Sequence, residues 1–162
     1  MDRGQVFSVD LVIAVVAFTV VMFLAAQVWS NSLARIDDWQ ERVEIQKAAN
    51  TASFFLVVSQ GYPDDWNRTT VQVLGLTNGE QNTIEHRKFA ELLTMDLSET
   101  KQFLNVEQYG LFLNLTNQSS GLEIGSKGIP PDISEAFEIA KIDSYVLYNR
   151  SMCILQLSLW KD

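Results

Sequence analysis

The sequence has very few of the side chains that form disulfides and metal centres. Its 162 residues include one cysteine, Cys153, and one histidine, His86. A single cysteine excludes an intramolecular disulfide and a cysteine-rich metal site. His86 has no second histidine, cysteine or carboxylate at ligand spacing, so we expect no metal ion there. Cys153 belongs to the apolar run Met152-Cys153-Ile154-Leu155, which predicts a buried thiol.

Basic residues are also scarce. Twelve Lys and Arg stand against twenty Asp and Glu, which gives a formal net charge of −8. Without a basic patch, nucleic acid is not an expected partner. The chain also lacks a glycine-rich phosphate loop, a G-x-S-x-G motif and a Cys/His pair for nucleophilic chemistry. Asp64-Asp65 has no further oxygen ligands at EF-hand spacing, so we interpret it as part of a turn. We therefore expect neither an enzyme nor a cofactor-binding protein.

A third absence concerns helix breakers, because neither glycine nor proline occurs between Gly4 and Gly61. The interval therefore predicts one continuous helix of about 50 residues. Its first part, Leu11–Trp29, is apolar at every position except Thr19 and Gln27. At about 28 Å it is long enough to cross a bilayer, which predicts a transmembrane anchor. A secretory signal peptide is the alternative, although its apolar region is shorter and the residues before Trp29 match its cleavage site poorly.

The apolar side of this predicted helix changes after the apolar stretch. One set of apolar residues shares a face, and the next set lies nearly opposite; the sets are Leu33, Ile36, Trp39 and Val43, then Ile45, Ala49, Ala52 and Leu56. We interpret the first face as a contact with another chain or the bilayer surface, and the second as packed under the chain's own domain. A kink near Glu44 that rotates the second part is the alternative explanation.

The helix is expected to stop at Gly61-Tyr62-Pro63, since glycine accepts a positive φ and proline cannot continue a helix. The alternating run Val71–Leu76 then predicts a short strand, and Asn78-Gly79 a turn. Thr83–Leu93 predicts an amphipathic helix with Thr83 as its N-cap. Its expected buried residues are Ile84, Phe89, Leu92 and Leu93.

The charged stretch Glu85-His86-Arg87-Lys88 lies within this expected helix and predicts a solvated helix face. A second short helix is expected to begin near Ser98, with Phe103 and Leu104 on its buried side.

The rest of the chain indicates strands. Tyr109–Leu115 predicts one strand, and a glycine- and proline-rich link, Ser119–Asp132, follows it. Ala136–Tyr148 and Ser151–Trp160 predict an antiparallel hairpin closed by a tight turn at Asn149-Arg150. The last strand places Cys153, Leu155, Leu157 and Leu159 on one side, opposite Gln156 and Ser158. The expected fold is α+β: a long, partly transmembrane N-terminal helix packed on a small antiparallel β-sheet head with one or two short helices.

The polar residues ahead of the apolar stretch carry a family resemblance. A short charged head, Met1-Asp2-Arg3-Gly4, precedes Gln5, and Ser8 and Asp10 follow before the apolar run. This order resembles the class III signal peptide of archaeal type IV pilin-like proteins, whose pattern is Q-x-S-x-E. Here the serine and the acid each stand one position later, and the acid is aspartate. The order G-Y-P-x-x-W followed by L-G-L, in Gly61–Trp66 and Leu74–Leu76, is also similar to the start of many heads in that family.

The resemblance implies a division of the chain and a function. Residues 1–4 would be a leader that a prepilin peptidase removes between Gly4 and Gln5. Residues 5–60 would be the long helix with its transmembrane and assembly segment at 11–29, and residues 61–162 an extracellular α+β head. The chain would be a structural subunit that assembles with copies of itself or other pilin-like subunits into a surface filament or related complex. Within it, Asp10 would meet the free α-amine of Gln5 from a neighbouring subunit.

Two observations concern the orientation of the chain in the membrane. Positive charges near the apolar stretch do not decide which end is inside. Four N-x-S/T sequons predict N-glycosylation acceptors on an exported head, with the N-terminus cytoplasmic; they begin at Asn67, Asn114, Asn117 and Asn149. The alternative function is a bitopic membrane protein that does not assemble and whose extracellular head binds a ligand or partner.

Overall fold

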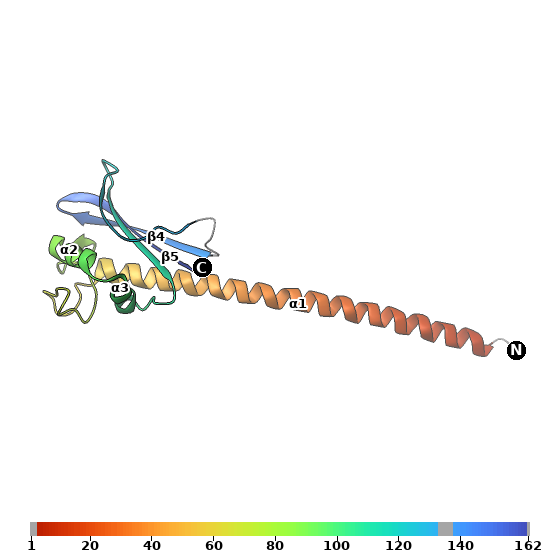
Figure 1. Cartoon of the computed structure of the whole chain (residues 1–162). Helices are drawn as coiled ribbons and strands as arrows, with labels where there is room; N and C mark the ends of the chain where they lie inside the picture. Colours follow the sequence, from red (N-terminus) through yellow and green to blue (C-terminus); the bar gives the residue numbers. More distant parts are fainter. Residues whose placement is uncertain (1–2, 133–137, 162) are drawn as a thin grey trace. The chain divides into compact units, whose positions relative to one another are not determined.

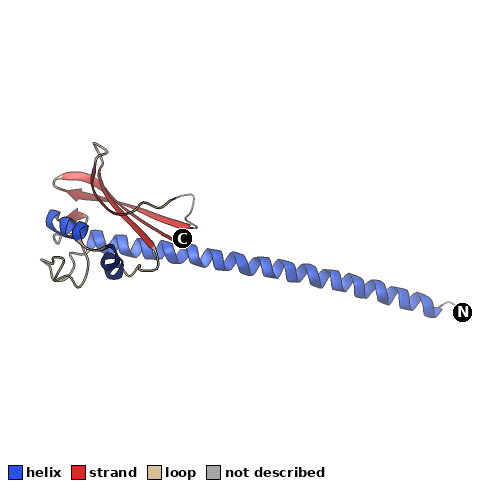
Figure 2. Ribbon diagram, viewed as in Figure 1, coloured by secondary structure: helices blue, strands red, loops and turns tan. Residues whose placement is uncertain are grey.

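A computed structural model describes residues 3–132 and 138–161, and it describes their side chains except at residues 3–8 and 31–38. The chain divides into two units, Met1–Glu41 and Arg42–Asp162. Helix α1 (Arg3–Val58) contributes to both units. All described strands and the helices α2 (His86–Thr94) and α3 (Leu97–Leu104) belong to the second unit. Figure 2 draws the strands red and the helices blue. The fold is α+β, as predicted.

The uninterrupted helix is confirmed, and it ends where the sequence predicts a stop. Its last residue is Val58, and Gly61 follows with φ +79°. Four residues at helical spacing are buried under the second unit, as predicted: Ile45, Ala49, Ala52 and Leu56. On the other predicted face, Trp39 is exposed and Val43 is half-buried, whereas the side chains of Leu33 and Ile36 lie outside the described residues.

The sheet has five strands in the order β1-β4-β5-β2-β3. Their bounds are Thr83–Ile84, Gly110–Asn117, Glu123–Gly128, Glu138–Tyr148 and Ser151–Lys161 for β1 to β5. Three of the four pairings are antiparallel, but β1 pairs with β4 in parallel. The expectation of a purely antiparallel sheet is therefore corrected to a mixed sheet. In Figure 1, β4 and β5 lie over the part of α1 that is drawn yellow.

The β4–β5 hairpin is confirmed in detail. Asn149 and Arg150 both have positive φ, at 49° and 64°, as a two-residue type I′ turn requires. The alternation of β5 is confirmed on its inner side, where four side chains are fully buried: Cys153, Leu155, Leu157 and Leu159. Opposite them Gln156 is half-buried and Ser158 is buried. The model describes β4 from Glu138, so Ala136 of the predicted strand lies outside the described residues.

Two strands were missed because their pairing depends on distant parts of the chain. Strand β3 lies inside the link that was expected to be irregular, and it pairs with β2 from Glu123 to Gly128. Strand β1 takes the first two residues of the predicted Thr83–Leu93 helix. The backbone N–H of Leu147 on β4 donates to the Asn82 carbonyl at 2.7 Å. Pairing with the edge of β4 therefore makes Thr83 and Ile84 a strand rather than the start of a helix.

The two short helices differ from prediction at their ends. Helix α2 is His86–Thr94, and its N-cap residue is Glu85 rather than Thr83. Helix α3 is Leu97–Leu104, close to the predicted start at Ser98. Leu104 is buried as expected, but Phe103 is 38% exposed.

The predicted strand at Val71–Leu76 is wrong, since only a single bridge joins Val73 to Tyr62. A close approach replaces it: the indole N–H of fully buried Trp66 donates to the Gly75 carbonyl at 2.8 Å. A Cβ on Gly75 would lie 2.4 Å from the Ser59 carbonyl oxygen, so this position requires glycine. Asp64 and Asp65 lie in a turn, as predicted.

Candidate functional site

The first candidate site is the apolar part of α1. Val9–Ser30 is a helical segment of 22 residues that is long and apolar enough to cross a membrane, and none of its side chains is buried. Bulky groups such as Phe18 and Trp29 are 66% and 70% exposed. A helix that is apolar on all sides needs an apolar environment. The segment is therefore compatible with a single-pass membrane protein, and equally with a signal sequence.

Thr19 and Asp10, two polar residues of this segment, differ in whether the helix supplies a hydrogen-bond partner. The hydroxyl of Thr19 donates to the Val15 carbonyl at 2.8 Å, so the helix itself satisfies it. Asp10 is exposed and has no hydrogen-bond or ion-pair partner among the described residues. An unpaired carboxylate is costly at the edge of an apolar phase. Asp10 is thus the charged group of this segment for which the described residues supply no partner.

The structure bears only slightly on the predicted leader junction. The backbones of Gly4, Gln5 and Ser8 belong to α1, but their side chains lie outside the described residues. Met1 and Asp2 of the predicted leader also lie outside them. The cleavage between Gly4 and Gln5 therefore stays a prediction.

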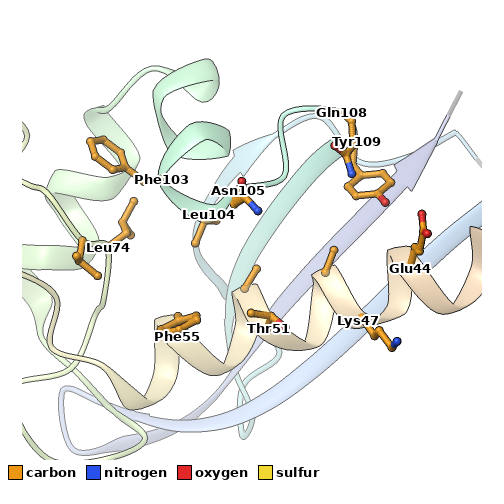
Figure 3. Close-up of a pocket in the computed structure, with 13 residues that line it drawn as sticks. Glu44, Lys47, Thr51, Phe55, Leu74, Phe103, Leu104, Asn105, Gln108 and Tyr109 are labelled. Atoms are coloured by element: carbon orange, nitrogen blue, oxygen red, sulfur yellow. The ribbon is translucent and has the colours of Figure 1, made fainter.

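A second candidate site is a groove of about 550 Å³ in the second unit, between α1 and the end of α3. Figure 3 shows Phe55 and Thr51 of α1 facing Leu104 and Asn105 across it. Its apolar lining includes Phe55, Val73, Leu74, Phe103 and Tyr109, and its polar rim includes Glu44, Lys47, Asn105 and Gln108. Phe55 and Val73 are 48% and 46% exposed. The groove can hold an apolar group, and its lining has no nucleophile paired with a base.

Sequence reasoning missed a buried cation, Lys88. It was expected on a solvated helix face, but its side chain is 1% exposed. The ammonium donates to the carbonyls of Gln60 and Thr77, both at 2.8 Å, and lies 3.4 Å from a Glu85 carboxylate oxygen. Lys88 thus satisfies the carbonyls at the end of α1 and in the following loop. The spacing held a signal for this: Lys88 stands one helical turn from both Ile84 and Leu92, on the apolar face. The charged stretch around it obscured that signal.

Three further titratable sites of the head form contacts that stabilise the fold or lie buried in it. Lys127 donates to the carbonyls of Leu93 and Met95 at the end of α2, and burial lowers the pKa of its ammonium. His86 forms a hydrogen bond with the Tyr148 hydroxyl, whose pKa is raised by burial. Cys153 is buried, as predicted, and burial raises the pKa of its thiol. The described residues contain no group of three metal-ligating side chains.

The four sequon asparagines lie in different surroundings. The side-chain oxygen of Asn67 accepts bonds from the amide and hydroxyl of Thr69, at 2.9 and 2.7 Å. Asn117 similarly accepts from two following amides at the end of β2, and Asn149 lies in the exposed hairpin turn. Asn114 instead lies within β2, and its side-chain oxygen is buried without a hydrogen-bond partner in the described part of the chain. The fold thus places Asn67 in a loop, Asn149 in a turn, Asn117 at the last residue of β2 and Asn114 inside the sheet.

Comparisons with protein-family models, with curated proteins and with solved structures found no match to this chain.

Proposed function

We propose that this chain is a pilin-like or pseudopilin structural subunit. It is anchored in the cell membrane and assembles through its N-terminal apolar helix into a surface filament or related complex. One observation carries the proposal: Asp10, without a described partner, stands at the start of a helical segment whose apolar side chains are all exposed. Such a segment buries its surface in lipid or against other copies of itself, and the carboxylate then needs a cation.

The leader supplies that cation in this proposal. A prepilin peptidase cuts between Gly4 and Gln5, and the α-amine of Gln5 becomes free. This ammonium lies opposite Asp10 of a neighbouring subunit inside the apolar core. An isolated carboxylate there costs several kcal/mol, and the opposed charge offsets much of that cost while it fixes the register of the helices. Ser8 lies within the same junction.

The orientation follows from the same proposal. The N-terminus is cytoplasmic, and the head is extracellular, where its sequons meet the glycosylation machinery of exported proteins. Asn67 and Asn149 lie in a loop and a turn, and Asn117 ends β2, which suits modification better than the position of Asn114 within β2. The partners are the membrane, the peptidase and other pilin-like subunits.

A second function is favoured by the groove beside Phe55 and Phe103. On that alternative the chain is a bitopic membrane protein that does not assemble, and its head binds an apolar group of a ligand or partner. Asp10 is then an interfacial residue with little effect.

Replacement of Asp10 separates the two functions. We expect Asp10→Ala to remain in the membrane fraction but to lose assembly, and Asp10→Glu, which keeps the charge, to retain it. The measurement is the amount of chain in filaments or complexes released from cells, compared with the amount in membranes. N-terminal sequencing of assembled chain should begin at Gln5. Assembly of Asp10→Ala at the wild-type level would contradict the pairing and favour the bitopic protein.

A further inference from the structure

Strand β4 has a long free edge. Along one side it pairs with β5 over its whole length, Glu138 to Tyr148. Along the other side it pairs with β1 only at Leu147 and Tyr148. No other strand of the described chain lies beside it from Ile139 to Tyr145. Unpaired backbone groups on a sheet edge are a template for another strand.

The hydrogen bond between β1 and β4 shows which residues present these groups. The N–H of Leu147 points to β1, since it donates to the Asn82 carbonyl. Backbone groups of alternate residues in a strand point to the same side. Four residues therefore direct both N–H and C=O to the free edge: Ile139, Lys141, Asp143 and Tyr145. Backbone groups presented by alternate residues in this way are those that an extended strand pairs with.

We propose that a second copy of this chain occupies the edge, through antiparallel pairing of β4 with β4 around a two-fold axis at Ile142. In this register residue 139 faces residue 145 of the other copy, and residue 141 faces residue 143. The four edge residues of each copy are then all paired. Each β1 begins directly beyond them, beside Leu147, so the pairing extends from residue 139 to residue 145 of each copy.

The charges on the edge select the same register. Lys141 of one copy lies opposite Asp143 of the other, and the two-fold axis repeats this pair. Ile139 lies opposite Tyr145, a β-branched residue beside an aromatic one. Both kinds of cross-strand pair stabilise antiparallel sheets. A shift of the axis by one residue would instead place Lys141 opposite Lys141, or Asp143 opposite Asp143.

The intrachain contact of these charges does not oppose the pairing. Lys141 and Asp143 lie 3.6 Å apart within one copy, and their side chains are 54% and 48% exposed. Exposed ion pairs contribute little to stability. Each side chain can therefore exchange its neighbour in the same strand for the opposite charge in the other copy.

The pairing joins heads that point in opposite directions. Arg42 lies beside Glu138, and Ser53 beside Ser144, so residues 42–58 of α1 run in the same direction as β4. In an antiparallel pair these helix segments are antiparallel as well. The β4–β4 pairing does not rest on assembly through the apolar helix, and either proposal can fail without the other.

Disulfide trapping of the full-length chain in detergent tests the register. In the proposed pair, Ile142 lies directly opposite Ile142 at a Cα separation of about 4.5 Å, which a disulfide can bridge. Ile142→Cys should therefore form a covalent dimer under mild oxidation. Tyr145→Cys is the matched control: it is more exposed, but its two copies lie six residues apart in register, about 20 Å. The wild-type chain with its buried Cys153 controls for the native thiol.

Charge reversal in the Ile142→Cys background tests the pairing itself. Lys141→Asp places acids opposite acids, and Asp143→Lys places bases opposite bases, so each variant alone should give about tenfold less dimer. A mixture of the two variants restores both ion pairs, and the heterodimer should form at the level of the parent. Chains tagged to different lengths identify the heterodimer on a denaturing gel.

Two results would overturn the proposal. One is cross-linking of Tyr145→Cys as efficient as that of Ile142→Cys, which would indicate random collision. The other is equal dimer formation by Lys141→Asp alone and by the mixture. Circular dichroism of each variant verifies that the head is folded before the yields are compared.

Discussion

The two ends of α1 use apolar residues in opposite ways. In Val9–Ser30 apolar side chains surround the helix, and none is buried. In residues 42–58 apolar positions recur at helical spacing, and the side chains of Ile45 and Leu56 are 2% and 0% exposed. A periodic pattern indicates a helix that packs on its own chain, whereas a uniform pattern indicates one that needs lipid or other chains around it. Helix continuity alone does not distinguish the two.

The largest difference between the two ends is expected when one leucine at each end is replaced by alanine. We expect Leu56→Ala to lower the free energy of unfolding of the head by about 2–5 kcal/mol, because it leaves a cavity in the core. Leu24→Ala, at a side chain that is 57% exposed, should leave that free energy unchanged. Denaturant unfolding of the full chain in detergent measures both. Equal losses in the two variants would contradict the assignment of the two ends to different environments.

A lysine introduced at each end tests whether the two ends differ in their effect on membrane insertion. Val20→Lys places an ammonium near the centre of the apolar segment, which should disfavour membrane insertion by about 3 kcal/mol. Gln46→Lys, at an exposed position of the second half, should have no effect on insertion. The measurement is the fraction of chain that resists alkaline extraction from membranes. If Val20→Lys is retained as well as Gln46→Lys, the segment does not span the bilayer.

The smallest expected effect concerns a contact where the second half of α1 begins. Arg42 and Glu138 lie 3.3 Å apart, with side chains that are 65% and 20% exposed. Because the guanidinium stays in water, Arg42→Ala should cost less than about 1 kcal/mol of head stability. A double-mutant cycle with Glu138→Gln measures the pairwise part. A coupling energy above about 2 kcal/mol would show that this ion pair, rather than the buried apolar face of α1, holds the helix to the sheet.

Elements that depend on local pattern were predicted closely. The long helix followed from the absence of glycine and proline, and the β4–β5 hairpin from alternation around Asn149-Arg150. Burial of the four α1 residues Ile45, Ala49, Ala52 and Leu56 also follows from spacing alone. Of the candidate sites, the sequence indicates the apolar segment and Asp10, since both depend on composition and position along one helix.

Elements that depend on distant partners were not predicted. Strand β3 has weak local propensity and exists because β2 offers it an edge. Thr83 and Ile84 fit an amphipathic helix equally well, and the edge of β4 decides the outcome. The groove beside Phe55 combines α1 with residues about 20 to 60 positions later, so no window of sequence contains it.

Lys88 shows what the sequence determines and what the tertiary structure decides. The sequence by itself determined that an amphipathic helix would occur in its region, because apolar residues recur there at helical spacing. Only the tertiary structure decided that this lysine is buried, since its carbonyl partners lie 28 and 11 residues away in the chain. The free edge of β4 has the same origin. Residues Ile139 to Tyr145 have the pattern of an ordinary strand. Among the described residues they have no partner on one side, because β1 is only two residues long.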